Sequence, residues 1–202
     1  MTEIVVMKSE YSIKHVSKKD CVDLLTQHHY LTGISRGFKS GANYGLIHSD
    51  KVVGVCIFTG LPVPELAKGM FGLNRDNQDG LYELSRLVLH PDYQRSEHNL
   101  AGWFVARAIK LLRQHNNVRA ILSYADNDYH SGTVYKALGF AYYGLTTPKS
   151  DFWIRQEDGT FLKHNRGSVK ELEGEWRPRS RKHRFLKVYD NTLEVKWKEC
   201  ER

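Results

Sequence analysis

The sequence predicts an α/β protein in which one mixed, mostly antiparallel sheet is covered by helices. Segments of strand period alternate with segments of helical period, short turn motifs separate them, and the 202 residues contain no internal repeat. A chain of this length can bury the core of one ordinary domain. We therefore expect one main domain followed by an appended extension.

The first third of the chain is predicted to form a strand, a helix and a hairpin. Residues 11–16 alternate like a strand, and Ser17 can cap the helix that follows. That helix places four residues on one side: Cys21, Leu24, Leu25 and His28. Residues 44–48 and 52–59 flank a Ser-Asp-Lys turn, which predicts two antiparallel strands.

The centre of the chain is predicted to be a long loop followed by a strand and an amphipathic helix. Residues 60–80 contain two prolines and several glycines, so we expect a loop that serves as a lid. Residues 81–89 read as a strand that the His90-Pro91-Asp92 run ends. Residues 100–114 have the helical period, with a basic face opposite the apolar one.

The last part of the chain is predicted to end in two hairpins. The remaining elements are, in order, a strand over 119–124, a short helix over 131–138 closed by Gly139, a strand over 140–145, and hairpins over 152–163 and 185–198. Asp158-Gly159 and Asp190-Asn191 mark the two hairpin turns. We expect residues 1–150 to form the main domain and residues 151–202 a basic β-hairpin extension packed on it.

Composition excludes several classes of protein. Hydrophobic residues make up 41% and charged residues 26%, which excludes disordered and fibrous chains, and the apolar runs are too short for a membrane span or a signal peptide. Three cysteines without a C-x-x-C pair exclude a disulfide scaffold and predict a reducing, cytoplasmic setting. The net charge of +7 makes a polyanionic partner plausible.

The most specific motif is Asn127 followed eight residues later by the run 135–140 (YKALGF). A short helix here can project Tyr135 into a cleft, where a phenol can act as general acid; packing in the core is the alternative. The run resembles the closing motif of the GNAT acetyltransferase superfamily, in which this tyrosine typically protonates the departing thiolate of coenzyme A. The resemblance implies a GNAT-like catalytic domain over 1–150, with a splayed central sheet.

The segment after residue 89 departs from the GNAT pattern. His90-Pro91-Asp92-Tyr93 is similar to the run that introduces the pyrophosphate loop, but Glu97 and Asn99 stand near the usual glycines. Glycine lets backbone N–H groups approach a diphosphate, whereas glutamate brings a like charge; alternatively, Glu97 only favours a helix start. The resemblance implies acetyl-CoA or a related acyl-CoA as cofactor, bound by Val88, Leu89, Arg95, Asn99, Leu100, Ala101 and Asn127.

Three further strings narrow the resemblance: residues 28–31 (HHYL), 83–87 (ELSRL) and 123–126 (SYAD). Over about residues 20 to 145 the chain looks like the Mom-like branch of the superfamily, phage proteins that modify DNA bases and so defeat host restriction. The resemblance implies transfer of a carbamoylmethyl, glycinamide-like group to the exocyclic N6 amine of adenine. The matching catalytic positions are His29, Tyr30, Ser85, Asp126 and Tyr135.

The residue types support roles in such chemistry. A Ser85 hydroxyl can meet a carbonyl or a base edge, and Asp126 at a strand's carboxyl end can accept a proton from an amine. Tyr30 can stack on an extruded base, and His29 can act as base or ligand. The alternatives are helix-end histidines near a dipole and a turn-forming aspartate. No histidine spacing fixes a metal site, so none is predicted.

The segment 176–187 (WRPRSRKHRFLK) predicts contact with double-stranded DNA. Its cations are Arg177, Arg179, Arg181, Lys182, Arg184 and Lys187. Cations interleaved with aromatic rings suit a phosphate backbone, although a solvated basic surface is the alternative. Two other functions stay open: an ordinary acyl-CoA-dependent N-acetyltransferase of a small amine or protein, and a non-catalytic DNA-binding protein on a GNAT scaffold.

Overall fold

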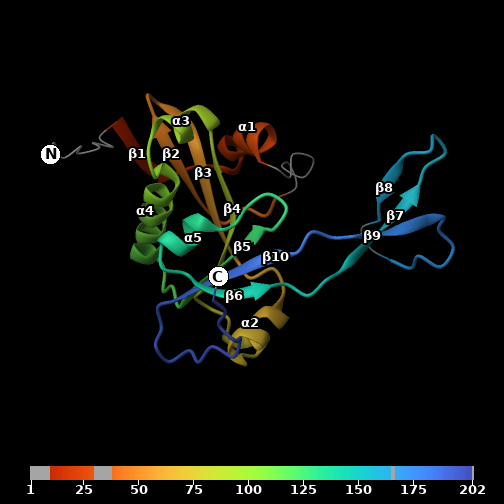
Figure 1. Ribbon diagram of the computed structural model, residues 1–202. Helices are drawn as coiled ribbons and strands as arrows, with labels where there is room; N and C mark the ends of the chain where they lie inside the picture. The colour runs from red at the N-terminus through yellow and green to blue at the C-terminus, as the bar shows by residue number, and fades with distance from the viewer. Residues whose placement is uncertain (1–9, 30–37, 165–166, 202) are drawn as a thin grey trace.

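The computed structural model describes residues 10–29, 38–164 and 167–201, which form a seven-stranded sheet with helices on both faces and a small projecting sheet (Figure 1). In spatial order the strands of the large sheet are β1 (Tyr11–His15), β2 (Ala42–His48), β3 (Lys51–Gly60), β4 (Leu81–Leu89), β5 (Ala120–Asp126), β10 (Lys182–Val188) and β6 (Ala141–Leu145). β4 and β5 run parallel, and the other neighbours are antiparallel. The predicted mixed, mostly antiparallel sheet is confirmed.

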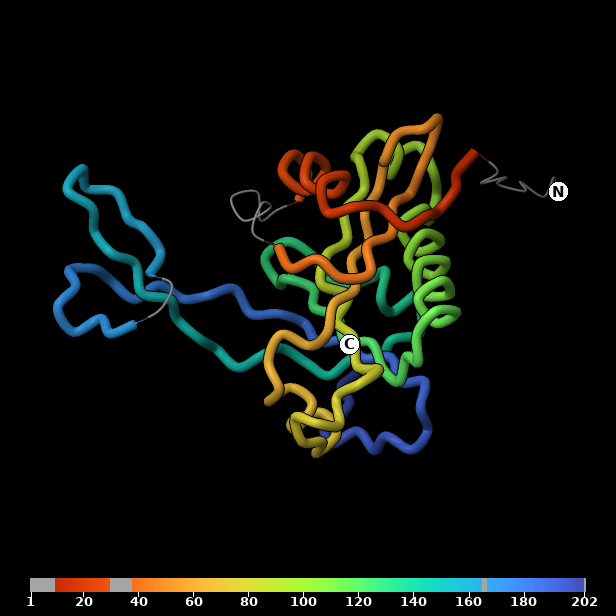
Figure 2. The backbone as a smooth tube through the Cα atoms, turned by 180° about the vertical axis from the view of Figure 1, so that it is seen from behind, coloured from red at the N-terminus to blue at the C-terminus, as the bar shows by residue number. Residues whose placement is uncertain are grey.

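The helices cover the large sheet on both faces. They are α1 (Lys18–His28), α2 (Pro64–Phe71), α3 (Pro91–Ser96), α4 (Leu100–His115) and α5 (Thr133–Ala137), with a 3-10 turn η3 (Arg75–Asn77). α4 and α5 share the largest apolar cluster with the sheet, whereas α1 and α2 each pack in a separate cluster. Figure 2 shows α1 and α2 from the face opposite to that of Figure 1.

The parallel strands β4 and β5 stay together over only part of their length. Their paired residues run from Leu81 opposite Ala120 to Leu84 opposite Ser123. Beyond this point β4 continues against β3, while β5 continues against β10. The carboxyl-terminal halves of β4 and β5 therefore separate and leave a gap in the middle of the sheet, which is the splay that the GNAT resemblance predicts.

The loop and lid predicted over 60–80 are wrong, because α2 occupies part of this segment. Pro64 stands in the first turn of α2, where proline removes no helical hydrogen bond. The apolar side chains of Ala67, Met70 and Phe71 fall at helical spacing and are buried, and Gly72 ends the helix at a φ of 73°. α2 is thus part of the fixed core.

The hairpin predicted over 185–198 is also wrong. β10 lies between β5 and β6 and pairs antiparallel with both, so part of the extension predicted over 151–202 is an internal strand of the large sheet. The segment after β10 forms no strand; its Leu193 is buried near α2, and the Lys196 amide donates to the Met70 carbonyl over 2.7 Å. An apolar strand pattern does not reveal which strand is its partner.

The hairpin predicted over 152–163 is confirmed and belongs to the projecting sheet. This sheet has the order β8 (Phe161–Lys163), β7 (Ser150–Arg155) and β9 (Gly174–Pro178), and it extends away from the large sheet (Figures 1 and 2). Phe152 is buried against the exposed Trp176, with ring centroids 5.3 Å apart. At its base, Asp151 forms ion pairs with Lys163 and Arg179.

No helix in the described part of the chain is long and apolar enough to span a membrane.

Gly132 at the start of α5 is expected to tolerate no side chain. Its φ is 74°, and an added Cβ would lie 2.2 Å from Cε2 of Phe185, whose ring is fully buried. Gly132→Ala should lower the free energy of unfolding in urea by about 3 kcal/mol, from left-handed strain and overpacking together. The control is Gly72→Ala, which has a similar φ of 73° but nothing within 4 Å of the added Cβ, and should lose about 1 kcal/mol. Equal losses would contradict the close contact.

Candidate functional site

The separated halves of β4 and β5 border a cleft of about 260 Å³. Four residues predicted to be catalytic line it: His29, Ser85, Asp126 and Tyr135. They come from the end of α1, from β4, from β5 and from α5. Three residues predicted to bind a cofactor also line the cleft: Val88, Leu89 and Ala101. The splay of two strands thus gathers groups that lie far apart in the sequence.

Tyr135 forms part of the cleft wall on the α5 side. Gly132 begins α5, and the amides of Leu138 and Phe140 donate to the Tyr135 carbonyl, which closes the short helix. The Tyr135 ring lies 5.3 Å from the Phe185 ring and 5.8 Å from the Phe140 ring, and the residue is buried. Tyr135 therefore both packs against β10 and borders the cleft, so the catalytic and the core interpretation each describe part of it.

Asp126 lies at the carboxyl end of β5, is buried and lines the cleft. Its Oδ1 accepts a hydrogen bond from the Ser180 hydroxyl and one from the Asp128 amide at 3.2 Å. The amide contact is the Asx turn that the sequence allowed. The contact with Ser180 is tertiary, because Ser180 is 54 residues away in the sequence, just before β10 begins at Lys182. Both bonds fix the orientation of the carboxylate toward the cleft.

Ser85 is held to the neighbouring strand. Its hydroxyl donates to the Ile57 carbonyl of β3 at 3.2 Å, which leaves the oxygen lone pairs as acceptors. The next residue, Arg86, also lines the cleft and donates from Nη1 to the Ser85 carbonyl at 2.6 Å. Ser85 is therefore oriented by β3, and Arg86 is a cation beside it that the sequence analysis did not assign.

His29 caps the carboxyl end of α1 and is 8% exposed. Burial, together with the positive charges of Arg86, His130 and Lys182, lowers the pKa of His29 to about 4. The imidazole is neutral at physiological pH. It can accept or donate a hydrogen bond in the cleft, but it is too weakly basic to hold a proton there.

A half-buried carboxyl lies next to these cations. Burial raises the pKa of Glu83 on β4, while Arg86, Lys182 and Lys39 oppose the shift. Burial raises the pKa of Tyr124 on β5 to about 12, and the negative charge of Glu83 contributes. The cations around His29 and Glu83 outnumber the acid, so this side of the cleft favours an anionic molecule.

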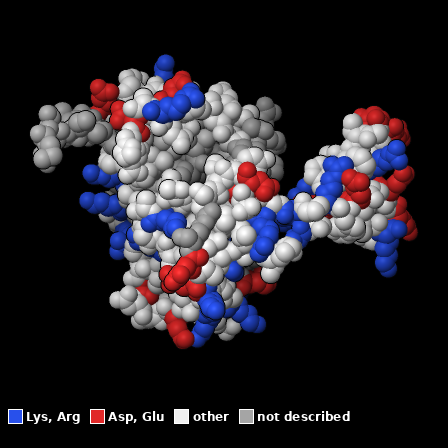
Figure 3. All heavy atoms as spheres, viewed as in Figure 1, with Lys and Arg blue, Asp and Glu red and all other residues white. Residues whose placement is uncertain are grey.

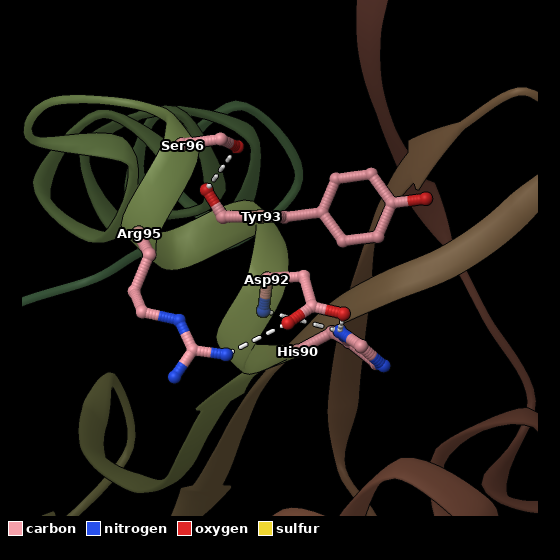
Figure 4. A network of polar contacts seen from close by, with 5 residues as sticks. All are labelled: His90, Asp92, Tyr93, Arg95 and Ser96. Carbon is pink, nitrogen blue, oxygen red and sulfur yellow. Dashed lines mark hydrogen bonds and ion pairs between the residues drawn. The ribbon is translucent and has the colours of Figure 1, made fainter.

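The start of α4 differs from a glycine-rich diphosphate cradle. α3 fills this segment, and Figure 4 shows Arg95 turned toward Asp92, which it meets at 2.7 Å. The Leu100 amide donates to the Glu97 carbonyl at 3.3 Å. A Cβ added to Gly102 would lie 2.3 Å from Oδ1 of Asn99, so the Asn99 side chain covers the first turn of α4.

The residues present therefore fit only one end of an acyl-CoA. The cleft can take a slender acyl-bearing arm beside Val88, Leu89 and Ala101. Among the described residues around the cleft, the lining does not include the other residues predicted to bind cofactor: Arg95, Asn99, Leu100 and Asn127. Leu100 is buried in the core, and the amide of Asn127 donates to the Arg181 carbonyl at 2.9 Å.

Tyr30, the fifth residue predicted to be catalytic, lies outside the described residues. Nowhere in residues 10–29, 38–164 and 167–201 do three His, Cys, Asp or Glu side chains gather closely enough to hold a metal ion.

The six cations of segment 176–187 do not form one continuous free track. Arg177 pairs with Glu175 at 2.5 Å, and Arg179 pairs with Asp151. Arg181 donates from Nε to the Thr146 carbonyl at 2.7 Å, and Lys187 donates to the Leu138 carbonyl. The Lys182 amide bonds Thr146, and the Arg184 guanidinium lies 4.6 Å from the Trp197 ring. The first two charges are neutralised by acids, and the last three belong to β10.

Several cleft residues were missed by the sequence analysis. Arg86 stands inside the ELSRL string and Tyr124 inside SYAD, so the motif itself could have pointed to them. Gln94 lines the cleft from α3. Ser180 had no sequence signal, because only the pairing of β10 with β5 brings it to Asp126.

The fold and the cleft define the class: the chain has the fold of the GNAT acetyltransferases. It superimposes on polyamine N-acetyltransferase from Drosophila melanogaster with a TM-score of 0.56 at 10% identity, over 89% of this chain and 100% of that one. It superimposes on the ribosomal-protein-S18-alanine N-acetyltransferase from Escherichia coli with a TM-score of 0.53 at 14% identity, over 89% of this chain and 94% of that one. A GNAT family acetyltransferase from Elizabethkingia anophelis with acetyl-CoA bound gives a TM-score of 0.53 at 12% identity, over 90% of this chain and 100% of that one.

Within that class, the model of the Mom protein family matches residues 10–198, and the chain belongs to this family. No curated protein matches the chain in sequence.

The lowered pKa of His29 has a consequence for stability. Because the folded pKa of about 4 is below the ordinary value, the unfolded chain binds this proton first as the pH falls. Stability should therefore drop between about pH 6.5 and 4, with a contribution from His29 of about 2–3 kcal/mol. His29→Gln should flatten the pH dependence of urea unfolding in that window. A profile equally steep in His29→Gln would contradict the assignment.

Proposed function

We propose that the protein is a transferase that adds a small acyl-derived group, of the carbamoylmethyl or glycinamide type, to the exocyclic N6 amine of adenine in DNA. The observation that carries the proposal is the cleft that joins His29, Ser85, Asp126 and Tyr135 in a chain of the Mom family. A phage would use such a modification to protect its DNA from host restriction in the bacterial cytoplasm.

The chemistry requires activation of a weakly basic amine. As the bond from N6 to the transferred carbon forms and the bond to the donor breaks, N6 must lose a proton. The Asp126 carboxylate, oriented by Ser180 and the Asp128 amide, would receive that proton. The Tyr135 phenol, which also lines the cleft, would protonate the leaving group. Ser85 and neutral His29 can hold the base and the group between them by hydrogen bonds.

Double-stranded DNA is the proposed partner, and its adenine must leave the stack to expose the amine. Arg86 and Lys182 adjoin His29 and Glu83, so cations surround the side of the cleft that this base would enter. The cations from Arg177 to Lys187 would add contacts to the backbone, the outer ones after release from their acidic partners.

The donor is proposed to be an acyl-CoA or a related carrier whose slender arm would enter the cleft. A thioester activates its carbonyl carbon, so direct transfer would give a glycyl amide of N6, an isomer of the carbamoylmethyl product, whereas the carbamoylmethyl group itself would require a carrier with its leaving group on the methylene carbon. The covered first turn of α4 does not fit a diphosphate, so none of the steps above is assigned to the carrier.

An ordinary acyl-CoA-dependent N-acetyltransferase is the second candidate, and the likeness of the whole chain to GNAT structures favours it. The excess of cations beside the cleft disfavours it, because polyamines and protein N-termini are themselves cationic.

Tyr135→Phe tests the proposed role of the phenol. The variant keeps the ring packing against Phe185, so it should fold and bind DNA normally while its modification rate falls by about 100-fold or more. The measurement is mass spectrometry of nucleosides digested from plasmid DNA of bacteria that express the protein, against an empty vector. The matched control is Tyr82→Phe, whose hydroxyl bonds Asn116 away from the cleft.

Wild type and Tyr82→Phe should yield a nucleoside heavier than deoxyadenosine by a carbamoylmethyl unit. Unchanged product from Tyr135→Phe would remove this residue from the chemistry. Acetylated amines with unmodified DNA would favour the second candidate.

A further inference from the structure

A second basic surface lies on α4, outside the cleft. α4 contains no Asp or Glu over residues 100–115, and its exposed cations are Arg107, Lys110 and Arg113. Figure 3 shows Lys and Arg atoms gathered along the left side of the molecule, over α4. We call these three residues, with Lys187 of β10, the α4 surface.

Two grooves meet on this surface. One, of about 450 Å³, lies between α4 and the end of β10 and is lined by Arg113, Lys187 and Tyr189. The other, of about 320 Å³, lies between α4 and β1 and is lined by Arg107, Trp103 and Tyr11. Lys110 lines both grooves, so the two grooves adjoin at this residue of α4. No acidic side chain lines either groove among the residues that the structure describes.

Arg107, Arg113 and Lys187 of the α4 surface contact uncharged groups. The Arg113 guanidinium lies 4.2 Å from the Tyr189 ring, and that of Arg107 lies 5.6 Å from the Trp103 ring. Lys187 donates to the Leu138 carbonyl. The nearby carboxylate of Asp190 accepts hydrogen bonds from Thr192 and is bound to Arg119 at 2.8 Å, and these contacts lower its pKa to about 2. Among the described residues, no carboxylate forms an ion pair with the cations of the α4 surface, in contrast to Arg177 and Arg179, which have carboxylate partners.

The spacing of these cations suits a phosphodiester backbone. Arg107, Lys110 and Arg113 are three residues apart, so each is about 4.5 Å further along the helix axis. Duplex DNA carries one charge per about 1.7 Å of its axis, so each side chain can meet a separate phosphate. Arginines that already contact rings lose little further side-chain freedom when they bind an anion, which favours a preformed anion-binding surface.

We propose that the α4 surface binds the backbone of duplex DNA in a sequence-independent manner, at a place separate from the base-modifying cleft. The choice of DNA as the polyanion that this surface binds rests on the proposed function. α4 and α5 cover the sheet face opposite to α1, from which His29 enters the cleft. The α4 surface thus contacts a different stretch of duplex from the one that inserts a base, and it keeps the protein on DNA between modification events.

The test is fluorescence anisotropy with unlabelled protein and a fluorescently labelled duplex of about 20 base pairs, without any donor of the transferred group. Binding is measured over about 50 to 200 mM salt. The variant is Arg107→Gln, Lys110→Gln and Arg113→Gln combined. The matched control removes three exposed cations elsewhere, by Lys19→Gln, Lys51→Gln and Lys68→Gln. Thermal unfolding of each variant checks that it is folded.

The α4 variant should bind at least about tenfold more weakly, and its slope of log affinity against log salt should fall by about 2–3. The control should keep the slope of the wild type. Equal loss in both variants, or wild-type binding by the α4 variant, would overturn the proposal.

A second readout uses the wild-type chain. Acylation of lysines with an amine-reactive ester, followed by peptide mass spectrometry, should show Lys110 protected by the duplex and Lys51 not protected. Reactivity of Lys110 that the duplex leaves unchanged would overturn the proposal.

These readouts fail separately from the proposed function. DNA that contains no modified nucleoside, together with α4-dependent binding, would reject the transferase proposal and leave the α4 surface standing. A modified nucleoside, together with DNA binding that does not depend on the α4 surface, would support the transferase proposal and reject the proposal for the α4 surface.

Discussion

The four-residue pairing of β4 with β5 is the constraint on which the rest of the structure depends. These strands share hydrogen bonds only from Leu81 to Leu84 and from Ala120 to Ser123. Past that point the facing edges of β4 and β5 no longer pair with each other, while their outer edges stay bonded to β3 and β10 along the strands. The outer pairings hold the separated halves in place, and these halves border the cleft. The site is thus a consequence of where the parallel pairing of two strands ends.

β10 links this constraint to the chemistry. It pairs Lys182 with Asp126 in register, so Ser180 and Lys182 arrive beside the carboxyl end of β5. It also brings the Phe185 ring under Tyr135 and against Gly132, which leaves no room for a Cβ. A strand from late in the chain therefore orients both the proposed proton acceptor and the proposed proton donor. The cations of the basic segment also differ in their partners. Arg184 and Lys187 of β10 contact uncharged groups, whereas Arg177 and Arg179, near the projecting sheet, form ion pairs with acids.

Local patterns explain which parts of the fold and site could be predicted. Strand and helix periods located β4, α4, β5 and α5, and the strings around Ser85, Asp126 and Tyr135 located three walls of the cleft. The same methods failed where the outcome depends on a partner far away in the chain. The glycines and prolines of residues 60–80 read as a loop, but burial of Met70 and Phe71 stabilises α2. The late apolar run read as a hairpin, but β10 gains more hydrogen bonds between β5 and β6 than from the segment that follows it.

The sequence by itself determined the type of sheet, the starts of α1 and α4 and several of the residues that line the cleft, because period, capping and side-chain type are local properties. Only the tertiary structure decided that Arg86 and Lys182 share an environment with His29, that Asn99 covers the first turn of α4, and that Arg113 and Lys187 border one groove. Each of these depends on the distance between residues remote in the chain. That distance is set by strand order and core packing, which no local pattern records.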